Sequence, residues 1–315
     1  MAIPFTQLVS ATYDAVANER KKAADQWSDS SFLTHLEKIG GVQRIAGGAT
    51  LQLTLDYQIN SAADFLLTDS TSTGTSKTEI LTAASYSLIP LVVPVNWTLF
   101  DEAVNSASNQ KVDLVTAIVD NAIASHDRSI ETAMFASTGG TDGFNTLVDL
   151  FSEDGTGTVG TIVSNTETWW KNKYKDWGTD TGATLLADYT TLWNDCSKGS
   201  GGRQPNVVVS GATMHAAFEA ALTPNQRFVN NAGTASGGFK ALQLKTADYI
   251  FTSQYTSDSA WMYNTNDTKL FVVQDAWRSR RSPVEHINAA MMNMKVFSVV
   301  QLATRNRSRG GVLFT

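Results

Sequence analysis

The sequence predicts an α+β protein with an extended hairpin, one long helix and a compact mixed domain. Three patterns carry this prediction. Apolar and polar residues alternate strictly from Leu51 to Gln58, a helical pattern free of glycine and proline runs from Asn109 to Ala136, and residues 182–272 mix helical stripes with short apolar runs. Strict alternation indicates a half-buried strand, and apolar spacing of three and four residues indicates a helix. Because strands and helices come in mixed order, we expect an α+β architecture.

Composition narrows the class of protein. The chain has 315 residues, enough to bury a core without a disulfide or a metal. Its single cysteine, Cys196, excludes an internal disulfide and a cysteine-based zinc cage, and its apolar neighbours at helical spacing predict a core position. The net charge is −6, and only 17% of the residues are charged, below the usual ~25%. Such a surface, with no dense basic stripe, favours broad protein contacts over sequence-specific binding of nucleic acid.

No segment predicts a membrane partner. The longest nearly apolar run, residues 88–95, is far shorter than the ~20 residues that cross a bilayer. The N-terminus turns polar directly after Met-Ala-Ile-Pro-Phe, so we expect no secretory signal and synthesis in the cytoplasm.

A long two-stranded hairpin is expected at residues 46–98. The strand at Leu51 is followed by a polar stretch, Asn60 to Lys77, and by a second strand-like stretch, residues 81–97. Pro90 and Pro94 lie four residues apart, so both lack a backbone N–H on the same edge of the strand. We expect this edge to face away from a partner strand. An isolated hairpin is only marginally stable in water. We therefore expect a neighbouring subunit to cover it, the alternative being its own domain; the candidate contact residues are Leu51, Leu53, Leu55, Tyr57 and Lys77.

The sequence shows no pattern typical of a reactive site. The four histidines have no partner at metal-ligand spacing, and His126 and its neighbour Asp127 are expected to point in different directions on a helix. No Gly-x-Ser-x-Gly motif occurs, and the glycine-rich run 155–160 lacks the features of a phosphate-binding loop. We therefore predict no catalytic residue, no cofactor and no metal.

Two arginine clusters remain without an assigned role. Their alternate spacing would place some of the side chains on one face of an extended segment. Three interpretations stay open: contact with DNA phosphates, pairing with acidic residues of a neighbouring subunit, or charges that protect a solvated strand edge. The first cluster is Arg278, Arg280 and Arg281, and these three residues are further candidates for contact between subunits. The second cluster is Arg305, Arg307 and Arg309.

The order of these parts resembles the major capsid protein fold of tailed phages, the Hong Kong phage fold shared with encapsulins. Short stretches are also similar to phage head proteins: Gly157-Thr158-Val159-Gly160 before Thr168-Trp169-Trp170, and Leu192 to Cys196 before Pro205 to Val209. The resemblance implies an N-terminal arm at 1–45, an extended hairpin loop at 46–98, a peripheral domain at 99–181 with a spine helix at about 105–138, an axial domain at 182–272, and return strands of the peripheral domain at 273–315.

The function implied by the resemblance is structural. The chain is expected to be a head subunit without enzymatic activity that self-assembles, as hexamers and pentamers, into an icosahedral shell around phage double-stranded DNA. It would be located in the virion and assembled in the host cytoplasm, with a separate scaffolding protein, a portal and at most non-specific contact with DNA. No residue-level match supports subunit crosslinking through Lys77. The alternatives are an encapsulin-like compartment, another virion component, or a hydrolase with a scattered active site.

Overall fold

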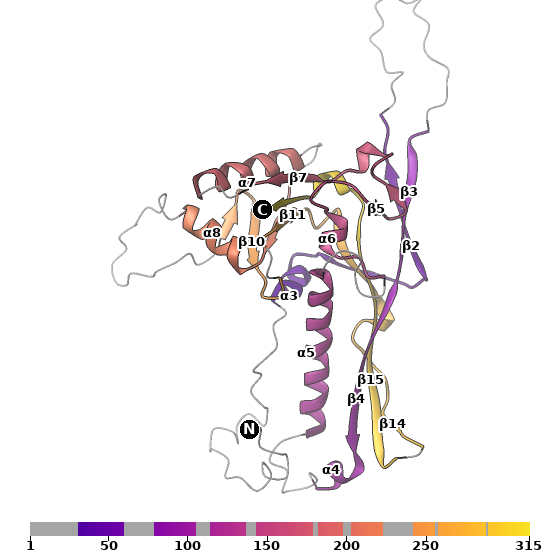
Figure 1. Cartoon of the computed structure of the whole chain (residues 1–315). Helices are drawn as coiled ribbons and strands as arrows, with labels where there is room; N and C mark the ends of the chain where they lie inside the picture. Colours follow the sequence, from indigo (N-terminus) through magenta and orange to yellow (C-terminus); the bar gives the residue numbers. More distant parts are fainter. Residues whose placement is uncertain are drawn as a thin grey trace, which may run out of the picture.

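The molecule is elongated, with a body from which two structures project in opposite directions (Figure 1). The hairpin leaves the body at one end, and a long helix beside a ribbon of strands extends from the other. The expected arm at 1–45 falls mostly, and Lys77 falls entirely, outside the described residues. The computed structural model describes residues 31–59, 79–104, 114–136, 143–178, 182–197, 203–222, 242–255, 258–287 and 289–315.

The predicted hairpin is present but shorter than expected. Strands β2 (Thr50–Asp56) and β3 (Leu81–Ser87) pair antiparallel, with Leu53 opposite Ala84. The strand ends before Leu88, and the following strand, β4 (Ile89–Thr98), belongs to another sheet. The prediction of one hairpin over 46–98 is therefore wrong for residues 89–98, because these residues pair with a longer strand elsewhere.

That partner is the long C-terminal strand β15 (Met291–Thr304), which pairs antiparallel with β4 from Met291–Thr98 to Val300–Ile89. In the described residues β4 has no second partner strand, which fits the two prolines that it carries. We call the sheet that contains β4 and β15 the peripheral sheet. Its other strands are β1 (Val42–Ile45), β12 (Thr268–Val273), β13 (Ser279–Arg280) and β14 (Val284–Glu285).

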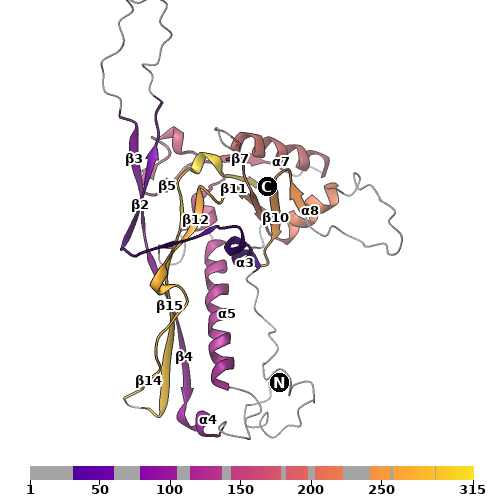
Figure 2. The same cartoon turned by 180° about the vertical axis from the view of Figure 1, so that it is seen from behind.

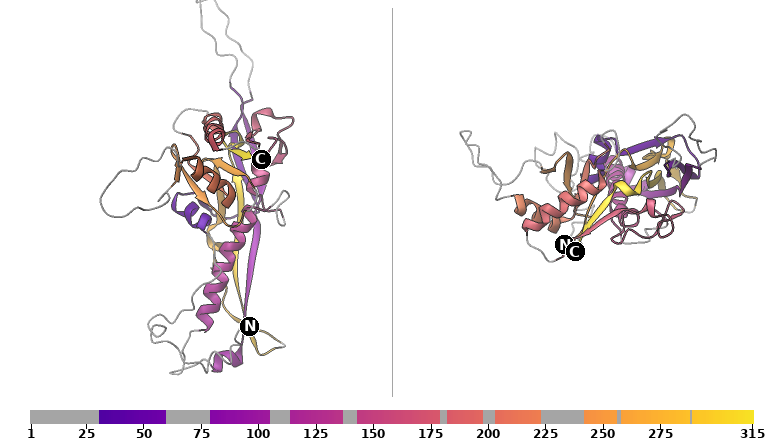
Figure 3. Two further views of the ribbon diagram at one scale, coloured as in Figure 1. Left: turned by 60° about the vertical axis from the view of Figure 1, so that its left-hand side comes forward. Right: turned by 90° about the horizontal axis from the view of Figure 1, so that it is seen from above.

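The spine helix α5 (Leu114–Met134) lies along the β4–β15 ribbon, as Figures 1 and 3 both show. Its 21 residues span about 30 Å at ~1.5 Å per residue. The expected helix at 105–138 is confirmed over this stretch, and residues 105–113 lie outside the described part. Alternate residues of the ribbon pack against the helix, which explains the period of two in β15: Val95, Trp97, Met294 and Val296 form a buried cluster with Ala122. A short helix that was not predicted, α4 (Leu99–Val104), follows β4.

The compact part of the molecule is built on a second sheet of six strands, which we call the axial sheet. Helices α7 (Gly182–Cys196) and α8 (Ala212–Leu222) cover one face, where Tyr189, Cys196 and Val208 are buried together. The other face meets the body, where Val207 and Val209 join a different core cluster. The strands, in sheet order, are β7 (Lys173–Asp176), β16 (Gly311–Phe314), β11 (Ala260–Tyr263), β8 (Val207–Ser210), β10 (Ala247–Phe251) and β9 (Leu242–Leu244).

The expected division of the chain needs two corrections. Strand β12, assigned to the axial domain at 182–272, lies in the peripheral sheet between β1 and β15 (Figure 2). Conversely β7 and β16, assigned to the peripheral domain, are strands of the axial sheet. Local patterns identify strands but not the sheet that they join.

The segment 143–178, for which no single helix or strand was predicted, carries several short elements. They are α6 (Leu147–Leu150), which a capping box from Thr146 and Asp149 begins, the two-stranded turn of β5 (Thr158–Val159) and β6 (Ile162–Val163), and the 3-10 turn η2 (Thr168–Trp170). Arg307, in the 3-10 turn η5 (Arg307–Arg309), is fully buried against this segment. Its guanidinium donates to the Leu150 carbonyl oxygen at 2.7 Å, Ser164 Oγ at 2.9 Å and the Thr156 carbonyl oxygen at 2.7 Å.

A buried carboxylate joins three parts of the molecule. Glu131 on α5 accepts a hydrogen bond from the backbone N–H of Leu33 at 3.1 Å and another from Thr252 Oγ1 at 2.8 Å. Leu33 belongs to helix α3 (Ser31–Lys38), and Thr252 follows β10 of the axial sheet. The spine helix therefore holds both neighbours through one side chain. No helix in the described ranges has the length and apolarity needed to cross a membrane.

Candidate functional site

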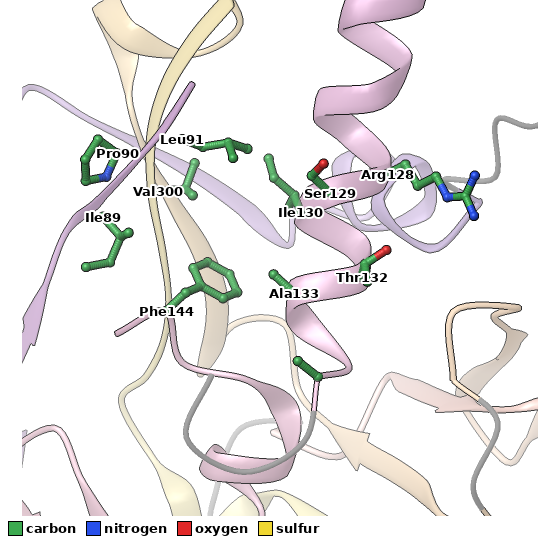
Figure 4. Close-up of a pocket in the computed structure, with 11 residues that line it drawn as sticks. Ile89, Pro90, Leu91, Arg128, Ser129, Ile130, Thr132, Ala133, Phe144 and Val300 are labelled. Carbon is green, nitrogen blue, oxygen red and sulfur yellow. The ribbon is translucent and has the colours of Figure 1, made fainter. Parts of the chain in front are cut away.

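The described residues hold no cluster of three or more histidine, cysteine or acidic side chains that could bind a metal. A pocket of about 380 Å³ lies between β4 and α5, with walls formed by Leu91, Ile130, Phe144 and Val300. In Figure 4, the side chain of Arg128 points away from these apolar groups. The pocket can accept an apolar group. Its lining holds no histidine or carboxylate, and the hydroxyls of Ser129 and Thr132 donate to Ser125 and Gln254, so none is paired with a general base.

One group of side chains has the distances of a nucleophilic triad. His126 Nε2 lies 2.8 Å from Ser298 Oγ, and His126 Nδ1 lies 3.1 Å from Asp127 Oδ1. The expectation that His126 and Asp127 point apart is thus wrong. However, His126 and Ser298 are fully buried, and Ser298 Oγ also accepts the Arg278 N–H at 2.8 Å. A substrate carbonyl cannot reach this hydroxyl. The hydrogen bond between His126 and Ser298 therefore joins α5 to β15 in the interior.

Arg278 is held inside the chain. Its Nε lies 2.8 Å from Asp127 Oδ1 and its Nη2 lies 3.0 Å from Glu37 Oε1, and the guanidinium stacks on the Trp277 ring at 4.6 Å. These contacts join α3, α5 and the start of β13. Nε and Nη2 of Arg278 thus have partners within their own chain, and the contact of Arg278 with another subunit stays a prediction.

The predicted contact residues of β2 also face the chain's own body. Leu53 and Leu55 are 3% and 5% exposed and belong to the main core cluster, against which Leu51 packs. The Tyr57 ring lies 5.3 Å from the Trp169 ring. The apolar face of the hairpin base is therefore covered by its own domain and not by a neighbouring subunit, as the alternative interpretation proposed.

Two of the predicted residues, Arg280 and Arg281, remain exposed. Arg281 stands over the Phe297 ring at 5.9 Å, on the face of the ribbon that α5 does not cover. The same face carries Lys295, which is exposed, and Val92, which is 45% exposed and lies opposite Phe297. We call Val92, Arg281, Lys295 and Phe297 the open face. Its strand pairing could not be derived from local sequence patterns.

A second exposed apolar group lies around the far end of the ribbon, beyond the point where α5 covers it. Phe100 of α4 is 71% exposed, Val284 of β14 is 66% exposed, and Ile287 is 97% exposed. Phe100 follows Leu99, and Val284 and Ile287 lie in a stretch without regular apolar spacing, so no periodic signal marks these positions in the sequence. Exposed apolar residues that are scattered singly are common on protein surfaces, so exposure alone assigns these three no contact.

Comparison with known proteins identifies the fold. No family model and no curated protein matches the sequence. Among solved structures, the capsid of an empty GTA particle matches with a TM-score of 0.65 at 12% identity, covering 99% of this chain and 97% of that one. The cyanophage A-1(L) capsid matches with a TM-score of 0.64 at 12% identity, covering 93% of this chain and 95% of that one. This chain has the tailed-phage capsid fold.

The same fold also occurs in a protein compartment. The holo-SrpI encapsulin complex from Synechococcus elongatus PCC 7942 matches with a TM-score of 0.56 at 12% identity, covering 96% of this chain and 95% of that one. The phage and GTA capsids fit better, at 0.64 and 0.65. The match to the tailed-phage capsid fold extends over nearly the full length in each comparison.

Proposed function

We propose that the chain is the major capsid subunit of a tailed phage, which assembles into an icosahedral shell around double-stranded DNA. The observation that carries the proposal is the full-length match to capsid proteins, with TM-scores of 0.64 and 0.65. The absence of an accessible catalytic group among the described residues supports a structural role rather than an enzymatic one. Hexamers and pentamers of the chain, in the virion, are its expected assembled state.

Contact between subunits would use the surfaces that the chain leaves open. The open face combines two positive charges with two apolar side chains. The polar stretch 60–78 of the hairpin carries Asp64, Asp69 and the apolar run Phe65-Leu66-Leu67, which are complementary in charge and polarity. At about 25 cal/mol per Å² of buried apolar area, many shallow contacts of this kind stabilise a closed shell. We place the hairpin of one subunit on the open face of the next.

Other components follow from the same proposal. A scaffolding protein on a separate chain and a portal would assist assembly in the host cytoplasm, and DNA would be contacted without sequence specificity, because the sequence carries no dense basic stripe. An encapsulin-like compartment is the second candidate, favoured by the encapsulin match. The contents of purified particles, nucleic acid or a cargo protein, distinguish the two.

Negative-stain electron microscopy of the purified chain, with a scaffolding protein where one is needed, tests the proposal. Closed particles of uniform diameter are expected. Deletion of residues 60–77, joined by a short turn, is expected to leave a folded subunit that makes no closed particle. A chain that stays monomeric under all assembly conditions, or normal shells from the deletion variant, would contradict the proposal or the role of the hairpin, respectively.

A further inference from the structure

The hairpin has few covalent or sheet constraints on its direction. Its two strands form a sheet of their own, with no third strand among the described residues. On one side it is joined to the body through Gly47 and Gly48, whose φ values of 141° and 122° suit glycine and few other residues. On the other side a single residue, Leu88, separates β3 from β4. Side contacts must therefore set the angle between hairpin and body.

The β5–β6 turn supplies such a contact. The backbone N–H of Ser85 in β3 donates to the Gly160 carbonyl oxygen at 2.9 Å. A Cβ at Gly160 would lie 2.8 Å from Ala84 Cβ and 2.8 Å from Tyr86 Cζ, so the turn and the strand touch without space for one added carbon. Ala84 and Tyr86 are 0% and 2% exposed, which shows that this contact is closed to water.

The turn itself is held firmly to the body. Trp170 Nε1 donates to the Val159 carbonyl oxygen at 3.0 Å, and Ser164 Oγ donates to the Gly157 carbonyl oxygen at 2.9 Å. Arg307 in turn donates to Ser164 Oγ. On the strand side, Tyr86 OH donates to the Thr304 carbonyl oxygen at 2.9 Å. Because both the turn and the strand are anchored, the close contact at Gly160 limits how far the hairpin can tilt toward the turn. We call this contact between Gly160, Ala84 and Tyr86 the stop.

We propose that Gly160 is the residue that sets the angle of the hairpin, and through it the curvature of the shell. This inference rests on the proposed function. The strands run on from Ala84 at ~3.3 Å per residue, so a small shift at the stop becomes a larger shift toward the tip. If the hairpin of one subunit lies on the next, its angle fixes the angle between neighbours. Particle diameter is then a direct readout of the contact at Gly160.

Substitution of two glycines of the same turn tests the proposal. Gly160→Ala adds a Cβ that collides with Ala84 and Tyr86 at a φ of 60°. Gly157→Ala is the control for backbone strain, because its φ of 103° suits alanine even less than the φ of 60° at Gly160, while its Cβ would meet nothing within 4 Å. We expect G160A to give particles of altered diameter or open shells, and G157A to give particles of wild-type diameter.

A measurement on the unassembled subunit separates this inference from the proposed function. Spin labels at Thr54→Cys on β2 and Asn121→Cys on α5, both exposed, report the hairpin angle by pulsed electron paramagnetic resonance, and the native Cys196 is buried. G160A is expected to shift the mean distance between the labels. If wild-type protein forms no shell, the proposed function fails, while the distance still decides whether Gly160 sets the angle.

A second variant covers the case in which G160A does not fold. Ala84→Gly removes the carbon that faces Gly160 and leaves a gap at the stop, so a broader distribution of distances and of particle diameters is expected. Wild-type distances and diameters in every folded variant, A84G included, would overturn the inference.

Discussion

Buried hydrogen-bonding side chains account for much of the order at the residue scale. Arg307 lies in the second arginine cluster, for which three surface roles were considered, and the structure places it in the interior instead. Burial lowers the pKa of Arg307 to about 10, so the guanidinium stays protonated at neutral pH. Its neighbour Arg309 pairs with Asp267 at 3.2 Å. The alternate spacing of these arginines predicted an extended segment, but Arg307 and Arg309 lie in the 3-10 turn η5, so the expected arrangement on one face is wrong for this cluster.

Replacement of Arg307 is expected to be costly. Arg307→Met keeps much of the volume but leaves the Leu150 and Thr156 carbonyl oxygens without a donor, and we expect a loss on the order of 3 kcal/mol in the free energy of unfolding. Arg305, which is exposed, provides the control: R305A is expected to change stability by less than about 0.5 kcal/mol. Urea denaturation of both variants measures the difference, and equal stabilities would contradict the assigned role.

The tyrosine pair of the axial domain predicts a dependence on high pH. Tyr189 OH and Tyr249 OH lie 2.7 Å apart, and burial raises the pKa of Tyr249 to about 12 and that of Tyr189 well above its ordinary value. In the unfolded chain a tyrosine ionises near pH ~10. The folded state thus keeps protons that the unfolded state releases, so this contribution is complete below about pH 10 and is lost as pH rises toward 12.

We expect the free energy of unfolding to fall between pH 9 and 11.5, and to fall less in the Tyr249→Phe variant, by on the order of 2 kcal/mol at the upper end. Tyr174→Phe, which changes an exposed ring, serves as the control and should keep the wild-type slope. Denaturant titrations at several pH values measure this. Parallel pH profiles for the wild type and Y249F would rule out the pair as the cause.

At the scale of elements, periodicity identified the long helix α5, the strand β2 and the helices within 182–272. These elements have one face buried along most of their length, and that produces a regular pattern. The pattern failed where partners are distant in sequence. Residues 81–97 were interpreted as one strand-like stretch, although β3 pairs with β2 and β4 pairs with β15.

The link between α3, α5 and the axial domain depends on Glu131. Glu131→Ala leaves the Leu33 N–H and Thr252 Oγ1 without their acceptor in a buried site, and a loss of about 2–3 kcal/mol is expected. Amide hydrogen exchange in residues 31–38 should rise, because α3 loses its attachment to the spine helix. Thr132→Ala is the control on the next residue, where the hydroxyl bonds to Gln254 at an exposed position. Unchanged exchange in α3 of E131A would show that packing alone holds this helix.

For the whole molecule, the capsid fold was predicted from the order of parts, and the solved capsid structures confirm it. One physical argument behind that prediction was wrong. The hairpin was expected to need a neighbouring subunit because an isolated hairpin is marginal, yet its base is covered by its own core. The sequence could not show this, because the covering residues, Val159 and Ile162, lie about a hundred positions away in a stretch without periodicity.

The proposed contact between hairpin and open face is testable by exchange of charges. Lys295→Glu should abolish or slow shell formation, and Asp64→Lys together with Asp69→Lys on the hairpin should restore it in part, since the favourable sign is recovered. Arg44→Glu, an equal change on exposed β1 at another edge of the sheet, is expected to assemble normally. Light scattering during assembly follows the rates. If K295E does not assemble and the two aspartate substitutions do not restore assembly, the partner of Lys295 is a residue other than these two aspartates.

The position of β16 in the axial sheet has a consequence for biosynthesis. This strand lies between β7 and β11, so the sheet has a gap at its interior until residues 311–314 have left the ribosome. Up to that moment β11 presents an unpaired edge, and the cluster around Leu192 and Leu313 is incomplete. The axial sheet of a nascent chain therefore stays incomplete until residues 311–314 can pair with β7 and β11.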